Sequence, residues 1–470
     1  MMVGAMSDIR LEEIELPEFG VPEERPELPV HLHAERLARL SASARRAGLD
    51  TVIVFADREH FANMAYLTGF EPRFEEALLI LAPGRHPVIL AGPENVGWPG
   101  AAKAPLETEM VLYPPFGLMG QDRSRTRPLG DLLRTHGVAA GATIGAVGLK
   151  YFGPSESATP ESWLDIPSYI ADTLRAVAGE RGRVVNAAAL LMDATEGLRA
   201  TNEIEQIAQF EFSACHTSEA VKRVLFGLRP GMREFEAAQL LRPIGLPLSC
   251  HPMLSSGPRA AFGLNSPSDR AMRRGEPYTV AYGVWGALNC RAGWLVESAD
   301  ELPAAARDYL ERLAIPYFAC VAEWYETMGI GVSGGTIDAL VKKRLGDPFF
   351  GVGLNPGHLL HLDEWMNSPI HPGSERRLAS GQAIQVDIIP ATGSAYFTSN
   401  IEDGIALLDA PGRAAFAERF PGAWTRIERR REFMAEAIGI RLAPEVLPLG
   451  NIPAYLPPFV LAPKRVLVKR

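Results

Sequence analysis

Helix and strand patterns alternate along the first part of the chain, and this alternation constrains the fold more than any other feature. A helical pattern of apolar residues starts near His33, and the β-branched run TVIVFA (51–56) then predicts a strand. The runs ALLILAPG and HPVILAG predict a hairpin, and the alternation continues through 129–138 and 142–149. Elements in this order predict an α/β domain that ends near residues 185–190.

The second part of the chain opens with a long helical pattern and continues as short strands. The helix runs from about Asn202 to about Phe226 and stops at GLRPGM, where Gly and Pro end it. A second long helix is predicted from about Ala304 to about Met328. Short strands and Gly-rich turns are predicted in three further segments, 278–297, 351–362 and 382–409.

We expect these patterns to form two domains flanked by two terminal segments. A chain of 470 residues is too long for one ordinary core. Residues 1–30 are rich in Glu and Pro and are interpreted as an extended arm laid over a neighbouring subunit. The first domain is assigned to 31–188 and the second to 189–440. The Pro-rich tail, 441–470, is interpreted as an irregular strap.

Charge and composition exclude several classes of partner. The net charge of −9 argues against nucleic acid or an anionic membrane, since both require a basic face. No run of about 18 apolar residues is present, and the acidic N-terminus lacks a signal-peptide pattern, so a cytoplasmic location is expected. The four cysteines form no CxxC pair, which favours reduced thiols over a disulfide framework or structural zinc site.

Five groups of segments along the chain carry the resemblance to a known family. HAERLARLSASARRAGLD opens the first domain, and GLRATNEIEQIAQFEFSACHTSEAV with GLRPGMREFEAA opens the second. SSGPRAAFGLNSPSDRAMRRGEPYTV leads into the predicted hairpin, and SGQAIQVDIIP and NIEDGIALLD are later strands. Together these segments resemble the creatinase, aminopeptidase P and methionine aminopeptidase superfamily. The resemblance implies an α/β creatinase-like N-terminal domain, an α+β pita-bread C-terminal domain of the catalytic type, and a homodimer.

The resemblance also implies where metal ligands would stand. Most enzymes of this superfamily hold two metal ions with two aspartates, one histidine and two glutamates. The aspartate positions fall on Ala281 and Ala292, the histidine on His358, the first glutamate on Asp387 and the second on Glu402. Because a methyl group cannot ligate a hard cation, a two-metal peptidase is not expected.

Three further histidines of the superfamily bind substrate and transfer protons near the metals. Their positions fall on Leu264, Leu354 and Trp365, none of which titrates. Peptide hydrolysis needs an activated water and a proton donor for the leaving amine. The loss of these groups therefore argues further against peptide cleavage.

The remaining polar residues support three interpretations. His358, Asp387 and Glu402 can form an acid–base centre, hold a single Mn, Fe or Zn ion, or only hydrogen-bond to one another. The leading hypothesis is a creatinase-like hydrolase of a C–N bond in a small non-peptide molecule, with no cofactor expected. The alternative is a non-catalytic small-molecule-binding protein. The third is an Xaa-Pro aminopeptidase- or dipeptidase-like metallopeptidase.

Candidate substrate-binding residues surround this centre. His251 lies in a segment that lines the pocket of relatives, and His361 shares a side with His358 only if their segment is helical. Arg291 can hold an anionic substrate or pair with Asp387 or Glu402 in place of the metal ions. Arg73 matches a loop that reaches into a partner's pocket in dimeric relatives; its other interpretation is an exposed loop charge. Two cysteines, Cys250 and Cys290, are nucleophiles only if their pKa is lowered, and otherwise fill the interior.

Overall fold

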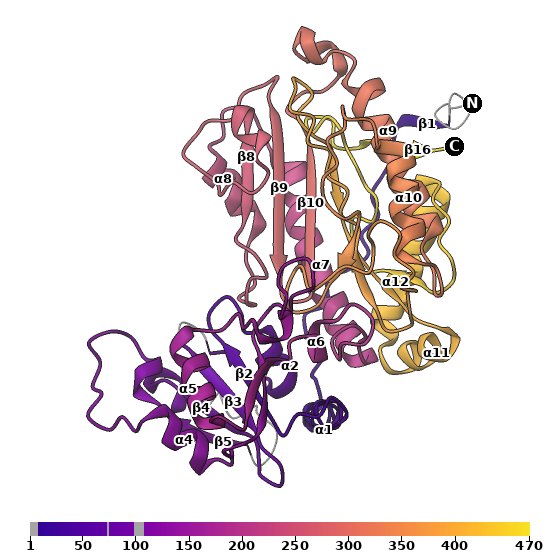
Figure 1. Cartoon of the computed structure of the whole chain (residues 1–470). Helices are drawn as coiled ribbons and strands as arrows, with labels where there is room; N and C mark the ends of the chain where they lie inside the picture. The colour runs from indigo at the N-terminus through magenta and orange to yellow at the C-terminus, as the bar shows by residue number, and fades with distance from the viewer. Residues whose placement is uncertain (1–7, 73–74, 98–107) are drawn as a thin grey trace. The chain divides into compact units, whose positions relative to one another are not determined.

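The computed structural model describes residues 8–72, 75–97 and 108–470, and the chain divides into two compact units (Figure 1). The small unit is Leu28–Ala200. The large unit joins the N-terminal segment, up to Glu27, to Thr201–Arg470. The chain therefore passes between units near residue 200, a little after the boundary expected from composition.

The small unit is built on a six-stranded mixed sheet with the order β5-β4-β3-β2-β6-β7. Its strands are β2 (Thr51–Ala56), β3 (Ala77–Leu81), β4 (Val88–Ala91), β5 (Glu109–Leu112), β6 (Thr143–Val147) and β7 (Arg183–Asn186). Its helices are α1 (Val30–Arg46), α2 (Ala62–Thr68), α3 (Pro93–Val96), α4 (Leu129–Thr135), α5 (Ser168–Ala178) and α6 (Ala189–Met192). The predicted strand over 51–56 is confirmed, and β3 and β4 form the predicted antiparallel pair.

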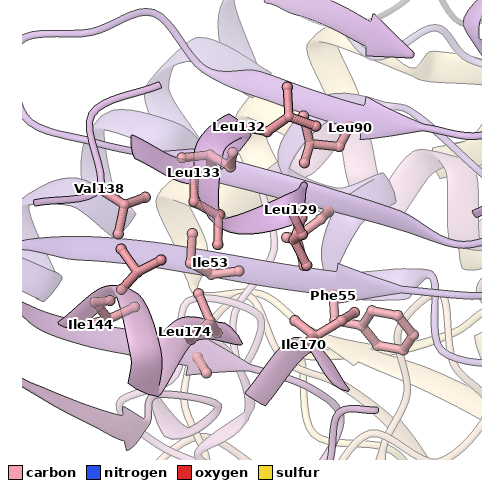
Figure 2. Close-up of a cluster of buried hydrophobic side chains, with 14 of the residues drawn as sticks. Ile53, Phe55, Leu90, Leu129, Leu132, Leu133, Val138, Ile144, Ile170 and Leu174 are labelled. Carbon is pink, nitrogen blue, oxygen red and sulfur yellow. The ribbon is translucent and has the colours of Figure 1, made fainter. Parts of the chain in front are cut away.

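The core of the small unit lies between this sheet and two helices. Ile53 and Phe55 of β2 and Leu90 of β4 pack against the leucines of α4 and against Ile170 and Leu174 of α5 (Figure 2). The aliphatic residues of β2 are buried along the whole strand, because the strand is central in the sheet.

The large unit contains two four-stranded sheets. One has the order β13-β10-β9-β8 and the other β11-β12-β14-β15. The strands are β8 (Met253–Ser256), β9 (Pro277–Val284), β10 (Ala287–Trp294), β11 (His358–Leu359), β12 (Ala383–Gln385), β13 (Asn400–Glu402), β14 (Gly404–Leu407) and β15 (Val446–Pro448). The β9–β10 hairpin confirms the prediction for 278–297. Gln385 Nε2 donates to the Leu288 carbonyl at 2.8 Å and ties the second sheet to this hairpin.

Helices cover the two sheets of the large unit. They are α7 (Ile204–Gly227), α8 (Glu234–Ala238), α9 (Ile315–Thr327), α10 (Gly334–Leu345), α11 (Ala410–Arg419) and α12 (Pro421–Phe433). The long helix α7 agrees with its prediction and packs against β10 (Figure 1).

The prediction of one continuous helix over 304–328 is wrong. A 3₁₀ turn over Ala304–Ala306 and a π-helical turn over Leu310–Ala314 precede α9. Pro316 lies in the first turn of α9, and a proline has no N–H to donate to the preceding turn. The hydrogen-bond ladder therefore changes register at this point. None of the helices in the described residues is both long and apolar enough to cross a bilayer.

The two ends of the chain pair with each other. β1 (Ile9–Glu13) forms an antiparallel ribbon with β16 (Arg465–Lys469). The N-terminal segment also contacts α7, where Lys222 Nζ lies 2.7 Å from Glu18. The N-terminal arm is thus held by contacts within its own chain. The C-terminal tail is likewise not wholly irregular, since β15 joins the second sheet.

Candidate active site

The register of the first sheet defines the face on which the site lies. Cys290 is opposite Ala281 on one side and opposite Glu402 on the other. Two residues along β10, Ala292 is opposite Asn400. Residues opposite each other in antiparallel strands, and residues two apart on one strand, point to the same face. All five side chains therefore share one face of the sheet.

This face is apolar around the lost aspartates. Ala281 packs in a cluster with Met253, Leu288 and Cys290, and Cys250 lies against it. Asn400 Nδ2 donates to Glu402 Oε1 at 2.9 Å and is 3.1 Å from Cys290 Sγ. This face of the sheet therefore carries the methyl groups of Ala281 and Ala292, the thiol of Cys290 and the amide of Asn400.

The structure brings together the three predicted catalytic residues. His358 begins β11, Asp387 follows the end of β12, and Glu402 ends β13. His358 Nε2 is 3.9 Å from Asp387 Oδ2. The three residues are 0%, 4% and 7% exposed, so their charges interact with little screening by water.

Glu364 is a member of the site that sequence reasoning missed. Its Oε1 is 3.2 Å from His358 Nε2, closer than Asp387. The next residue, Trp365, stacks on the imidazole with ring centroids 4.2 Å apart and an interplanar angle of 24°. The signal in the sequence was weak, because an acidic residue beside an aromatic one is also typical of an exposed loop.

Burial and mutual repulsion set the proton affinities of the carboxyl groups. Burial raises the pKa of Asp387 to about 6, with His358 opposing the shift. Burial, with repulsion from Asp387 and Glu364, raises the pKa of Glu402 well above its ordinary value. Burial lowers the pKa of His358, but Glu364 and Asp387 outweigh it, and the net pKa is raised. Compared with the free side chains, Glu402 is thus shifted toward its neutral acid and His358 toward its cation.

No protein-family model and no curated protein matches the sequence. Solved structures do match. A prolidase from Thermococcus sibiricus superposes with a TM-score of 0.63 at 17% identity, covering 80% of this chain and 95% of its own. An Xaa-Pro dipeptidase from Bacillus anthracis has a TM-score of 0.60 at 17% identity, covering 81% and 96%. An X-Pro aminopeptidase from Thermotoga maritima MSB8 has a TM-score of 0.56 at 16% identity, covering 78% and 95%.

This chain has the pita-bread fold. The likeness covers most of each solved chain, so the fold resemblance seen in the sequence is confirmed. At such low identity the likeness concerns the fold, and the chemistry has to be argued from the site.

The residues of this pita-bread site do not fit the pair of metal ions. Ala281 and Ala292 offer no ligand atoms. His358 Nδ1 contacts the Leu359 carbonyl at 3.2 Å, and Nε2, which has no hydrogen-bond partner among the described residues, lies 3.2 Å from the Glu364 carboxyl, which favours a protonated ring. A histidine ligand must instead turn an unprotonated nitrogen toward the metal. Across the described ranges, no group of three or more His, Cys, Asp and Glu side chains has the geometry of a metal site, so these residues offer no preformed ligand set for a single ion.

Arg291 does not bind an anionic substrate in this pita-bread structure. It is fully buried on the other face of β10, where Nη2 is 2.9 Å from Asp403 Oδ2. Its remaining donors reach the carbonyls of Tyr455, Ile452 and Cys290. The guanidinium thus fastens the C-terminal tail to the sheet, and its carboxylate partner is neither Asp387 nor Glu402.

The other residues predicted to bind substrate lie in different surroundings. His251 is exposed, and its Nε2 lies 2.8 Å from the Leu264 carbonyl, on the loop after β8. His361 is fully buried, accepts from the Leu362 N–H at its own Nδ1, and lies edge-on to Phe210 of α7. Its segment is not helical, so it does not share a side with His358. Arg73 lies outside the described residues.

The two thiols near the site are not activated. Burial raises the pKa of Cys250 to about 12 and raises that of Cys290 well above its ordinary value, with Glu402 adding to both shifts. A neutral thiol is a poor nucleophile. Both cysteines therefore fit the interpretation as filling residues.

Proposed function

We propose that this chain is a hydrolase that cleaves a C–N bond in a small non-peptide molecule, with His358, Asp387 and Glu402 as its acid–base centre. The carrying observation is that a buried histidine and two buried carboxyl groups share one site, with His358 Nε2 3.9 Å from Asp387 Oδ2. Glu402 holds its proton to a higher pH than an ordinary glutamate, whereas Asp387 has a pKa of about 6. One site then contains both an acid and a base near neutral pH, as C–N hydrolysis requires.

The roles follow from these proton affinities. Asp387, as a carboxylate, accepts a proton from the attacking water, whose oxygen bonds to the substrate carbon. Glu402 donates its proton to the nitrogen as the C–N bond breaks. His358, as a cation, stabilises the negative charge that develops on the reacting centre. Proton transfer from Asp387 to Glu402 restores the starting state, so protons balance over the cycle.

The polar lining of the site favours a ligand with N–H donors. Asp387 Oδ1 and Asn400 Oδ1 are buried and have no hydrogen-bond partner among the described residues. Both atoms act only as acceptors when the carboxyl is ionised. The neighbouring floor of Met253, Ala281 and Leu288 is apolar and favours a small uncharged substituent beside those donors.

Two other functions each have one observation in their favour. The matched solved structures include prolidases and an Xaa-Pro dipeptidase, which favours peptide cleavage by fold, but Ala281 and Ala292 remove the metal ligands that such chemistry uses. The near-complete burial of His358 under Trp365 favours a protein that binds a small molecule without turnover.

The proposal is tested with protein purified without added metal. Guanidino, ureido and cyclic amide compounds are screened for release of ammonia or amine, and Xaa-Pro dipeptides are screened with and without Mn²⁺. We expect turnover of a non-peptide compound that Asp387→Asn and Glu402→Gln each reduce by at least about 100-fold. The exposed Glu375→Gln serves as the control and should retain full activity.

Two results would overturn the proposal. Dipeptide cleavage that requires Mn²⁺ would establish the metallopeptidase. A compound that binds stoichiometrically, with no turnover of any member of the panel, would establish the binding protein. For a true substrate we also expect kcat/KM to fall as the pH drops below about 6, since Asp387 must lose its proton to act as the base.

A further inference from the structure

The imidazole of His358 is enclosed by groups that constrain both of its nitrogens. Nδ1 is 3.2 Å from the Leu359 carbonyl oxygen, which can only accept a hydrogen bond. Nε2 is 3.2 Å from Glu364 Oε1 and 3.9 Å from Asp387 Oδ2. Nδ1 has a hydrogen-bond partner, whereas Nε2 has no aligned partner among the described residues, so the two carboxyl groups act on Nε2 through their charge and raise the pKa of the ring.

Trp365 constrains the plane of the same ring. The near-parallel stack, at 4.2 Å and 24°, places the indole face against the imidazole. The negative face of an aromatic ring stabilises a cation placed over it. Trp365 is still 38% exposed, so it shields the ring on its solvent side.

Glu364 differs from the other carboxyl groups of the site in its exposure. Its side chain is 22% exposed, whereas that of Asp387 is 5% exposed. Among the described residues of the site, Glu402, Cys250 and Cys290 also titrate, and burial raises the pKa of each. Glu364 therefore pairs with Nε2 more readily than Asp387 does, because it is closer to the ring and its carboxylate is better hydrated.

We propose that Glu364 and Trp365 are positioning residues, which hold the His358 ring in one orientation with Nε2 on the side of the carboxyl groups of the site. The inference rests on the proposed acid–base function, in which His358 acts as a cation. Neither residue contacts the reacting atoms in this scheme. Glu364 holds the Nε2 side of the ring by charge, and Trp365 prevents the ring from turning toward solvent.

The test observes the ring directly and needs no substrate. Protein labelled with ¹⁵N-histidine is studied by long-range ¹H–¹⁵N NMR at pH 7, and the His358 signals are assigned by their loss in His358→Gln. We expect two protonated ring nitrogens in the wild type and in Glu375→Gln. Glu364→Gln should convert one of them to the unprotonated form, and Trp365→Leu should remove the upfield shift of the ring C–H signals while Trp365→Phe retains it.

The outcomes separate this inference from the proposed function. Two protonated nitrogens in Glu364→Gln would show that Asp387 alone suffices and would overturn the role of Glu364. Unshifted C–H signals in the wild type would overturn the role of Trp365. If the spectra agree with expectation and no compound is hydrolysed, the hydrolase proposal fails and the positioning stands. With a substrate available, Glu364→Gln should lower kcat by about 10- to 100-fold with little change in KM.

Discussion

The buried ion pair between Arg291 and Asp403 offers the sharpest test of how the large unit is held together. The two side chains are 0% and 4% exposed and lie 2.9 Å apart. The prediction is that Arg291→Met destabilises the large unit by about 3–5 kcal/mol, because it leaves a buried carboxylate without its counter-charge. Methionine keeps much of the volume, so the loss reports charge and hydrogen bonding more than a cavity.

The hydrogen bonds of Arg291 and of Asp403 indicate how much stability is lost when either side chain is replaced. Arg291 also donates to four backbone carbonyls, each hydrogen bond worth about 1 kcal/mol. Asp403 accepts from Asn289 Nδ2 at 2.8 Å and from the Ala454 N–H at 2.9 Å. Those donors partly hold Asp403 when the arginine is removed. Asp403→Asn keeps the shape but leaves the guanidinium without its counter-charge. The double variant should therefore lose less than the sum of the single variants.

Urea denaturation followed by tryptophan fluorescence provides the assay, since Trp294 and Trp324 are buried in the large unit. The control is Arg274→Met, which breaks an exposed pair with Glu301 and should cost at most about 1 kcal/mol. A loss below about 1 kcal/mol for Arg291→Met, equal to that of the control, would refute the reasoning. Strict additivity in the double variant would also refute it, because two groups in contact must then act independently.

Three further predictions follow from the site and the backbone. The pKa of Asp387 is about 6 in the folded state, above its unfolded value, so its contribution to stability is lost as the pH rises through about 6. Asp387→Asn should therefore raise the free energy of unfolding by about 1–3 kcal/mol at pH 8 and change it little at pH 4, as measured by urea titration. Gly439 has φ +86 and a close approach to the Lys469 carbonyl, so Gly439→Ala should lower the Tm by several degrees more than Gly231→Ala, which has φ +92 and open space. Ala281→Asp with Ala292→Asp should lower the Tm and bind less than one equivalent of Mn²⁺ by metal analysis, because His358 remains engaged by Glu364; two bound equivalents would contradict this.

Local patterns predicted the elements on which the site is built. The run TVIVFA forms β2, the segment after Asn202 forms α7, and the hairpin that presents Ala281 and Ala292 forms as expected. These features depend on residue periodicity within one segment, which the chain carries by itself. Pro316 was also a readable signal, since its missing N–H coincides with the change of hydrogen-bond register from the π-helical turn to α9.

The partners of charged residues were not predictable in the same way. Arg291 was expected to serve an anion or to pair with Asp387 or Glu402, but it pairs with Asp403 on the opposite face of the sheet. Glu364 gave no periodic signal, yet it is nearer to His358 than Asp387 is. Such pairs form between residues on different strands and loops, and each pairing is worth much only because both groups are buried together.

The amino-acid sequence by itself determined the order of elements, the resemblance to the pita-bread fold, and the absence of aspartate at 281 and 292. Only the tertiary structure decided that Glu364 is the carboxyl group nearest to His358 Nε2 and that Arg291 binds the C-terminal tail. It also decided that burial raises the pKa of Glu402. The physical reason is that periodicity acts along one segment, whereas proton affinity and charge pairing depend on the register between strands and on the depth of burial.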